Sequence, residues 1–225
     1  MKKKILILST SQVTIESFLI PHIEKLKNKF DVSILTQLSS NRLVIRNVKI
    51  YNFNIDRKIN LLNDLNSLFF LNNFIRQNNF NLLFTITPKA GLLGAISGFI
   101  NLVPSRIHIF TGQVWVNKNF IYKFFLKFFD KLIVKLNTDI LCDSLAQRRF
   151  LIENSFSKKI KVLGKGSICG VNTKIFKPNK FNRNALRKKF NIKNNEVVFI
   201  YVGRINKDKG IWDIIEVSKL LSLSK

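Results

Sequence analysis

The sequence has few residues of the kinds that build metal and redox centres. Its 225 residues include two cysteines and two histidines. Cys142 and Cys169 stand far apart, without the short spacing that zinc or iron–sulfur ligands require. We therefore expect two free thiols in a reducing compartment, rather than a disulfide or a metal centre.

Acidic residues are also scarce. The chain has 13 Asp and Glu residues against 38 Lys and Arg residues, which gives a formal net charge of +25 at pH 7 and a pI of about 10.4. A charge of this size favours anionic partners. Nucleic acid, an anionic membrane surface and phosphorylated small molecules all meet that condition, so charge alone leaves three classes of partner open.

No hydrophobic run is long enough for a membrane anchor. Residues 5–8 (ILIL) follow a run of lysines, but they are too few for the core of a signal peptide and fit a first β-strand better. Residues 90–103 are mostly apolar and fall short of the ~20 residues that span a bilayer. We therefore expect no transmembrane span and no export signal, and a buried helix in this second segment.

Two common phosphate-binding motifs are missing as well. No G-x-G-x-x-G follows the first apolar run, which argues against a nicotinamide or flavin site. The segments 87–91 (TPKAG) and 164–170 (GKGSICG) both lack the Walker spacing G-x-x-x-x-G-K-[ST]. Other strand–loop–helix turns are then the candidates for binding phosphate.

Short apolar runs alternate with longer periodic segments along the chain. The runs that predict strands are 4–8, 32–35, 48–53, 82–86, 106–110, 140–142, 160–163 and 197–202. The segments that predict helices are 15–28, 61–77, 90–101, 119–136, 145–153, 184–190 and 210–221. This alternation predicts an α/β fold, in which a Rossmann-like parallel sheet has helices on both faces.

Three local signals refine this pattern. Pro21 lies inside the first predicted helix and predicts a kink or a break there. Residues 144–147 (SLAQ) form a capping box at the start of the helix after the sixth strand. The polar segment 176–180 contains Pro178 and is the best candidate for a domain boundary. We expect one domain over residues 1–178 and the incomplete start of a second over 179–225.

Ligands of open α/β sheets bind beyond the carboxyl ends of the strands. The loops at those ends are 9–14, 87–91, 111–115, 143–144, 164–171 and 203–210. Just before one of them, alternation along the strand places Arg106 and His108 on the face opposite Ile107 and Ile109. His108 could orient a phosphate or shuttle a proton, or it could be a structural histidine whose hydrogen bonds are satisfied.

The last of these loops combines several features of a phosphate site. Gly203 permits a tight turn and the close approach of another molecule to the backbone. Arg204 and Lys209 place two positive charges beside the start of the next predicted helix, whose free N–H groups carry a partial positive charge. A solvated basic turn without a ligand explains the same residues equally well.

The helix predicted at 119–136 is both aromatic and basic. Its lysines recur every four residues and form one stripe on the helix surface, at Lys123, Lys127, Lys131 and Lys135. Such a helix suits the surface of an anionic membrane, where each lysine adds ~1 kcal/mol of binding free energy. A core helix with a lysine-coated solvent face is the alternative.

Several segments, in order, match a known pattern. The opening strand–turn–helix is followed by 87–94 (TPKAGLLG) and 106–115 (RIHIFTGQVW), then by 166–172 (GSICGVN) with Phe176 and Pro178, and last by 201–204 (YVGR) with 209–210 (KG). Together they resemble the family-4 retaining glycosyltransferases of the GT-B fold, of the kind that builds bacterial surface polysaccharide. The second and third segments are similar to a subgroup that acts on lipid-linked sugars.

The resemblance implies a division of labour between two Rossmann-like domains. The first would hold the acceptor, and the second a nucleotide-sugar donor, which we expect to be UDP-linked. Gly203, Arg204 and Lys209 would bind the donor diphosphate and stabilise the departing group. His108 would act as the catalytic residue beside the sugar. The acceptor-side loops would contribute Lys89, Gly91, Thr111, Gly112 and Gln113.

The resemblance also implies partners and a location. The family typically needs no metal, and no cofactor is expected besides the donor substrate. The lysine-rich helix would dock the first domain on an anionic membrane that carries the lipid-linked acceptor. The expected location is cytoplasmic, peripheral at the inner face of the plasma membrane.

The chain departs from the family pattern in two places. Asn172 stands where the family usually has Asp. The family's Glu-x7-Glu pair, which binds the donor ribose and sugar, would lie beyond Lys225. We therefore expect no transferase activity from this chain alone, whether it is a fragment, a truncated gene product or a split enzyme with a separately encoded C-terminal half.

Two other functions remain as alternatives. A nucleic-acid-binding protein would explain the charge of +25, but the lysines are scattered over many elements and no recognition module is apparent. A sugar-nucleotide 2-epimerase would share the GT-B architecture. Such an enzyme needs acid–base carboxylates in its cleft, and the loops here supply few of them.

Overall fold

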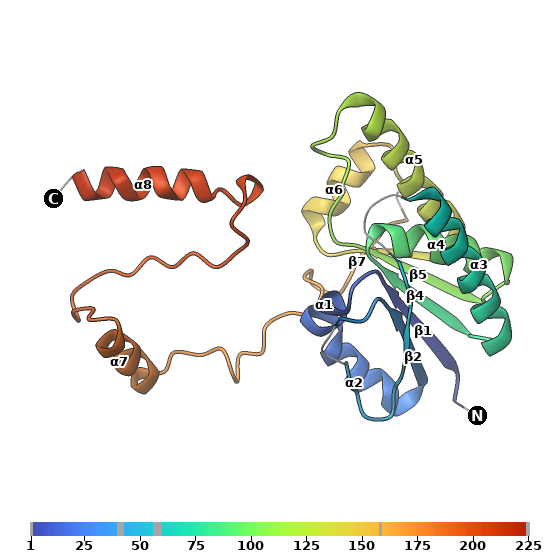
Figure 1. The fold of residues 1–225 in the computed structure, drawn as a ribbon, viewed down its shortest axis with the longest axis horizontal. Helices are drawn as coiled ribbons and strands as arrows, with labels where there is room; N and C mark the ends of the chain where they lie inside the picture. Colours follow the sequence, from blue (N-terminus) through green and yellow to red (C-terminus); the bar gives the residue numbers. More distant parts are fainter. Residues whose placement is uncertain (1, 40–42, 56–59, 158, 224–225) are drawn as a thin grey trace. The chain divides into compact units, whose positions relative to one another are not determined.

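The computed structural model describes residues 2–39, 43–55, 60–157 and 159–223. The chain divides into two compact units, Met1–Val171 and Asn172–Lys225, whereas the predicted boundary follows Pro178. Figure 1 follows the chain through both units, which we describe one at a time.

The first unit is built on a parallel sheet of seven strands in the order β3-β2-β1-β4-β5-β6-β7. All six neighbouring pairs are parallel. The strands are β1 (Lys4–Ser9), β2 (Asp31–Thr36), β3 (Lys49–Asn52), β4 (Leu82–Ile86), β5 (Ser105–Phe110), β6 (Asp139–Cys142) and β7 (Lys161–Val162). The predicted α/β, Rossmann-like fold of this unit is confirmed.

Helices cover both faces of this sheet because both faces are apolar. In β1, Ile5 and Ile7 pack in one core cluster while Leu6 and Leu8 pack in another, as alternation along a strand requires. The first cluster lies under η1 (Ile15–Leu19) and α2 (Ile20–Lys29), which follow the short helix α1 (Gln12–Thr14). The opposite face carries α3 (Leu61–Asn78), α4 (Pro88–Ile100), α5 (Phe120–Leu136) and α6 (Leu145–Glu153).

The first predicted helix is irregular near Pro21. Residues Ile15–Leu19 form a π-helical turn, and α2 begins at Ile20 with the proline in its first turn. Proline has no N–H to donate to the preceding turn, so the regular α-helical hydrogen bonding is interrupted close to the predicted place.

A side-chain cap starts α6, close to the predicted arrangement. The Ser144 hydroxyl accepts a hydrogen bond from the backbone N–H of Gln147 at 3.1 Å. The Gln147 side chain reaches back to the backbone N–H of Asp143 at 3.1 Å, one residue before the usual partner in a capping box. Both hydrogen bonds fix the loop between β6 and α6.

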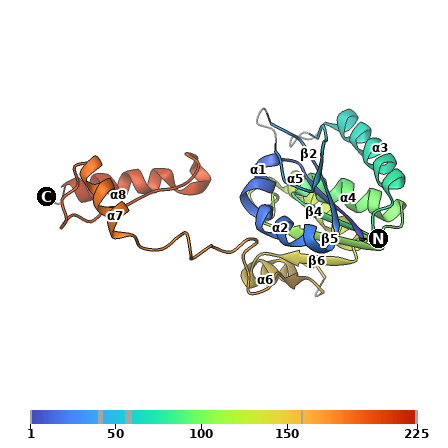
Figure 2. The ribbon, with the colours of Figure 1, turned by 90° about the horizontal axis from the view of Figure 1, so that it is seen from below.

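Three glycines let α4 lie very close to the sheet. A Cβ added at Gly91, Gly94 or Gly98 would meet the side chains of His108, Thr85 and Arg106 at 2.4, 2.5 and 3.0 Å, respectively. The predicted buried helix is thus confirmed, and its contact with the sheet depends on positions that lack a side chain. On its flanks, α4 packs against α3 and α5 (Figure 1, Figure 2).

A buried hydrogen bond anchors α5. The indole N–H of Trp115 donates to Asp130 Oδ2 at 2.8 Å, and Trp115 also stacks on Phe150 with ring centroids 5.4 Å apart. Burial raises the pKa of the Asp130 carboxyl from its ordinary value of 3.8 to about 6, while the bond from Trp115 partly opposes that rise. This acidic group therefore ties the loop after β5 to a helix made largely of aromatic residues and lysines.

The second unit has helices and no strand among its described residues. They are α7 (Lys180–Lys189), the short 3-10 helix η2 (Lys207–Lys209) and α8 (Ile211–Leu223). The strand predicted at 197–202 is wrong, since these residues are extended coil and the side chains of Phe199 and Val202 are 84% and 90% exposed. An apolar run becomes a buried parallel strand only beside a second strand, and this unit offers none in its described part.

We expect Asp130→Asn to change how stability depends on pH. The folded wild type binds a proton at Asp130 up to pH about 6, so its free energy of unfolding falls as the pH rises from about 4 to about 6. An asparagine can still accept the bond from Trp115 but does not titrate. Relative to wild type, the variant should gain roughly 3 kcal/mol over that window.

Urea unfolding of both proteins at pH 4.5 and pH 7.5 should show about 2 kcal/mol of this difference, because the carboxyl of the unfolded chain is already mostly ionised at pH 4.5. Any effect of the substitution that is independent of pH cancels between the two conditions. A stability difference that is the same at both pH values would contradict the buried-carboxyl interpretation.

Candidate functional site

The loops at the carboxyl edge of the sheet meet where the strand order reverses. The chain runs outward from β1 to β3 on one side and from β4 to β7 on the other, so β1 and β4 flank the switch point. Open α/β sheets bind ligands at this place. Here the two loops are joined, since the N–H and the hydroxyl of Thr10 both donate to Thr87 Oγ1, at 3.2 and 3.0 Å.

Thr87 has a backbone conformation that is unusual for its residue type. Its φ is 81° and its ψ is 143°, although it is β-branched. Holding such a residue costs on the order of 1–3 kcal/mol and requires a surrounding structure that fixes it. This conformation could not be predicted from the sequence, because the following Pro88 predicts only an extended residue before it.

Polar side chains are buried beside this switch point. Ser9, Thr10 and Gln12 are each less than 5% exposed. Gln12 donates to Glu16 at 2.8 Å and accepts from the backbone N–H of Ser39 at 3.0 Å. A pocket of about 270 Å³ lies here, lined by Thr10, Ser11, Gln12, Val13, Gln37, Leu38 and Ser39. The predicted loop at 9–14 thus borders a cavity.

His108 lies inside the structure, between the sheet and α4. Its side chain is 1% exposed, its Nδ1 is 2.8 Å from Thr85 Oγ1, and its ring packs edge-on against Phe110. Burial lowers the pKa of His108 from 6.5 to about 3, so the imidazole is neutral. This environment fits a structural histidine whose hydrogen bonds are satisfied. The catalytic contact of His108 with the sugar stays a prediction.

The predicted acceptor-side residues have different environments. The Lys89 ammonium lies 2.6 Å from Asp64 Oδ1, in a half-buried ion pair that joins α4 to α3. Gly91 lies against the His108 ring. Thr111 and Gly112 are exposed at the carboxyl end of β5, and Gly112 has a φ of 131°, which favours glycine.

Gln113 has one satisfied and one unsatisfied side-chain group. Its Oε1 accepts a hydrogen bond from Gln147 at 3.3 Å, which connects the loop after β5 to the start of α6. Its Nε2 is buried and has no partner among the described residues. A buried amide donor without a partner is costly unless a ligand or water accepts from it. Sequence reasoning selected this residue, but not its link to Gln147.

The predicted diphosphate residues all lie in the second unit. Gly203, Arg204 and Lys209 are exposed. The Tyr201 hydroxyl donates to the backbone oxygen of Arg204 at 2.7 Å and holds the turn. Gly210 has a φ of 68° directly before α8. A tight basic turn is therefore present without its predicted strand.

The lysine stripe of α5 runs along the side of the helix that faces the aromatic rings of Trp115 and Phe156. The ammonium groups of Lys123 and Lys127 lie 5.9 and 5.4 Å from the centre of the Trp115 ring. The ammonium of Lys131 lies 6.0 Å from the Phe156 ring, and Lys135 is exposed. Desolvation, followed by repulsion from Lys131 and Lys123, lowers the pKa of Lys127. These lysines therefore border the outward surface of α5 rather than fill it.

Two other kinds of site are absent from the described residues. No helix there is both long and apolar enough to cross a bilayer. Likewise, no group of three or more His, Cys, Asp and Glu side chains in that part of the chain could hold a metal ion.

We expect His108 to make the fold sensitive to acid. The unfolded chain binds a proton at this histidine below pH about 6.5, while the folded state binds it only near pH 3. The free energy of unfolding therefore falls as the pH decreases through this range, by up to about 1.4 kcal/mol per pH unit from this group. In wild type, Asp130 opposes this slope between pH about 4 and about 6.

Comparison of wild type with His108→Gln isolates this contribution. Chemical unfolding at pH 4, 5, 6 and 7 should show the stability difference shifting in favour of the variant as the pH decreases. His22→Gln is the matched control, because His22 is the other histidine and is only half-buried. Equal pH slopes for wild type and His108→Gln would show that His108 is not buried in the neutral form.

Two relatives match about three-quarters of the chain. A capsular polysaccharide biosynthesis glycosyltransferase, CapM of Staphylococcus aureus, is 35% identical over 169 residues, which are 73% of this chain and 43% of that protein. An Escherichia coli UDP-Gal:alpha-D-GlcNAc-diphosphoundecaprenol alpha-1,3-galactosyltransferase is 25% identical over 73% of this chain and 42% of its own. The chain therefore spans less than half the length of these two relatives.

A solved structure shows the same fold. A glycosyltransferase from Rickettsia africae superposes with a TM-score of 0.68 at 18% sequence identity, over 97% of this chain and 57% of that one. The family model of the glycosyl transferase 4-like proteins matches residues 4–136, which include β1 to α5 and the two loops that meet at the switch point. The chain belongs to the glycosyl transferase 4-like family.

Proposed function

We propose that this chain is the acceptor-side part of an enzyme that transfers a sugar from a nucleotide-sugar donor to a lipid-linked acceptor. Family membership supports glycosyl transfer, and the names of the two relatives support polysaccharide synthesis and a diphosphoundecaprenol-linked acceptor. The proposal implies work at a membrane surface, at the inner face of the plasma membrane. The observation that carries the membrane part is the outward surface of α5.

The first half of α5 turns its aromatic residues outward. Phe120, Phe124 and Phe128 are 83%, 65% and 54% exposed, whereas Asp130 and Ile133 are buried. Ile121, Tyr122 and Phe125 extend the exposed apolar surface. Water-exposed clusters of large apolar side chains mark interaction surfaces in soluble domains. We define the membrane-docking surface as Phe120, Ile121, Tyr122, Phe124, Phe125 and Phe128.

The lysines complete a pattern typical of interfacial helices. Such helices place aromatic side chains at the boundary between headgroups and acyl chains, and basic side chains beside anionic headgroups. Lys131 and Lys135 are exposed at the border of the membrane-docking surface. Lys123 and Lys127 lie nearer Trp115, from which their long side chains can still extend to headgroups. Aromatic insertion would then supply the binding energy, and charge the preference for anionic lipid.

The remaining site residues fit roles in transfer. Arg204 and Lys209 would stabilise the departing diphosphate without a metal ion, the donor being expected to carry UDP. The unpaired Nε2 of Gln113 would donate to an acceptor hydroxyl or phosphate oxygen, beside Thr111 and Gly112. Lys89, which is paired with Asp64, would act by fixing the start of α4 rather than by contacting phosphate directly.

Flotation with lipid vesicles tests the membrane proposal. We expect wild type to bind phosphatidylcholine vesicles only when they contain anionic phosphatidylglycerol. Lys131→Gln with Lys135→Gln should weaken binding roughly thirtyfold, since each lysine adds ~1 kcal/mol at such a surface. Phe124→Ser with Phe128→Ser should abolish binding. Phe181→Ser is the matched control, because Phe181 is 80% exposed on α7, outside the docking surface. Equal binding to neutral and anionic vesicles would refute the proposal.

A transfer assay tests the role of the second unit. We expect the purified 225-residue chain to transfer no sugar from UDP-galactose, UDP-glucose or UDP-N-acetylglucosamine to a polyprenyl-diphosphate-linked sugar. The reason is that residues 197–202 form no strand in this structure to hold the diphosphate loop. Vesicle binding should persist in the same preparation, which serves as its control. Measurable transfer would overturn this expectation.

A further inference from the structure

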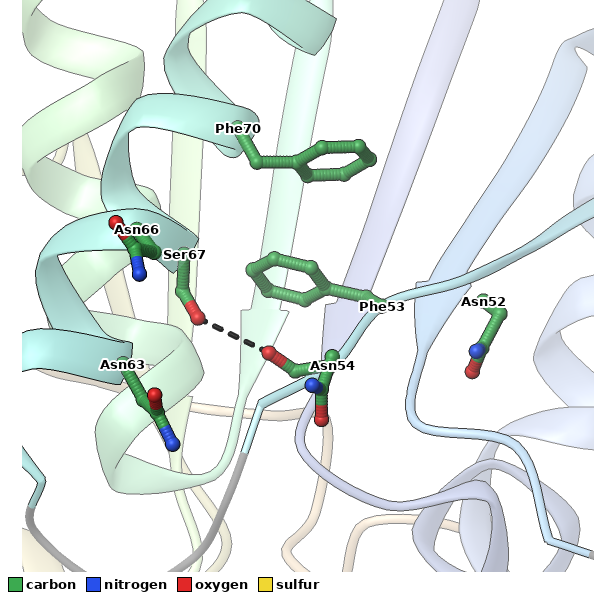
Figure 3. Close-up of a pocket in the computed structure, with 7 residues that line it drawn as sticks. All are labelled: Asn52, Phe53, Asn54, Asn63, Asn66, Ser67 and Phe70. Atoms are coloured by element: carbon green, nitrogen blue, oxygen red, sulfur yellow. Dashed lines mark hydrogen bonds between the residues drawn. The ribbon is translucent and has the colours of Figure 1, made fainter.

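A pocket of about 350 Å³ lies between the end of β3 and the first turns of α3. Its lining residues are Asn52, Phe53, Asn54, Asn63, Asn66, Ser67 and Phe70. Figure 3 shows α3 carrying four of them on one side, while the segment after β3 carries the others. Because the sheet is parallel throughout, this pocket opens at the same carboxyl edge as the acceptor-side loops.

The walls of this pocket are held in place. The Ser67 hydroxyl donates to the backbone oxygen of Asn54 at 3.0 Å and joins α3 to the segment after β3 (Figure 3). Asn52 Oδ1 accepts from the backbone N–H of Leu38 at 3.0 Å, which leaves its amide N–H groups to donate. These hydrogen bonds therefore hold both walls of the cavity, α3 and the segment after β3, in fixed positions.

Amide groups supply the polar chemistry of the pocket. The side chains of Asn54, Asn63 and Asn66 are exposed, and none has a hydrogen-bond partner among the described residues. Each carboxamide offers two donors and an acceptor, so a group that both donates and accepts, such as a hydroxyl, suits it well. Several hydroxyls on one rigid ligand would satisfy several of these amides at once.

An aromatic pair supplies the apolar chemistry. The rings of Phe53 and Phe70 stack with their centres 5.6 Å apart and their planes inclined by 22° (Figure 3). Phe53 is buried, but Phe70 is 47% exposed and offers ring surface to the pocket. An aromatic face attracts the weakly positive C–H groups of a saturated ring. The ligand is thus expected to combine hydroxyls with an apolar C–H face.

None of the described residues that line the pocket is charged, although the chain has a net charge of +25. No Lys, Arg, Asp or Glu is among its lining residues. A diphosphate or an anionic headgroup would gain more from the basic surfaces elsewhere. A neutral polyhydroxylated ring is the chemical class that matches the amides, the phenyl rings and the absence of charge among the described lining residues.

We propose that this pocket binds one uncharged pyranose ring of a glycan. Its volume is at the lower end of the range for small-molecule sites, about 300–1,000 Å³, which suits one ring and leaves little room for a second. The binding of a sugar in this pocket does not depend on the proposed function. The assignment of that sugar to the glycan of the lipid-linked acceptor does rest on it. The pocket would then hold a sugar of the growing chain and contribute to acceptor selectivity.

Saturation-transfer-difference NMR on the full chain tests this directly. The probes are methyl glucoside, methyl galactoside and N-acetylglucosamine, with glycerol as a polyol that lacks a ring. We expect at least one sugar to bind with a roughly millimolar Kd and glycerol to give no signal. Asn63→Ala with Asn66→Ala should weaken binding at least about tenfold, and Phe70→Leu should weaken it by removing the aromatic face while keeping apolar volume.

Asn73→Ala is the matched control, because Asn73 is an exposed asparagine on α3 that does not line the pocket. It should bind like wild type, and circular dichroism should show all variants folded. Three outcomes overturn the proposal: no sugar binds, glycerol gives equal signals, or the double asparagine variant binds as wild type does. Failure of vesicle flotation with sugar binding retained would remove the membrane proposal and leave this one standing.

Discussion

The close approach of α4 to the sheet is the constraint on which the candidate site depends. Gly91, Gly94 and Gly98 bring the helix backbone against the side chains of β4 and β5. The first turn of α4 then hydrogen bonds to Thr87, whose own hydroxyl accepts from Thr10 across the switch point. A side chain at Gly91 or Gly94 would collide with His108 or Thr85 and force the helix away from the sheet, which would separate the two loops. The packing of α4 therefore determines how the loops after β1 and β4 lie at the carboxyl edge of the sheet.

Electrostatics in this chain depends on placement more than on total charge. The excess of basic residues is spread over many elements, while the acids and histidine that matter are buried at specific contacts. Asp130 keeps a raised pKa beside Trp115, and His108 stays neutral below α4. Their opposite contributions to the pH dependence of stability follow from the same physical cause, because burial disfavours whichever form is charged. On α5, the neighbouring aromatic rings turn the lysines to the border of an apolar surface.

The second unit shows how far local sequence can be from local structure. Residues 197–202 have strong strand propensity, and all of them except Tyr201 are exposed. Residues with strand propensity are those whose side chains pack well on a pleated, half-buried sheet surface. The described part of this unit provides no such surface. The tight turn at Gly203 and the glycine at 210 persist because both depend on local hydrogen bonds and dihedral angles. Turns therefore survive where the strand does not form.

The sequence by itself determined the elements of the first unit, because periodicity and caps are local. Alternating apolar runs predicted all seven strands, and Ser144 with Gln147 predicted the start of α6. It also selected His108, Lys89 and Gln113 as site residues. Tertiary structure alone decided their states: the burial of His108, the ion pair of Lys89 with Asp64, and the φ of Thr87. These depend on which elements meet in space, and contacts between residues far apart in the sequence leave no local pattern.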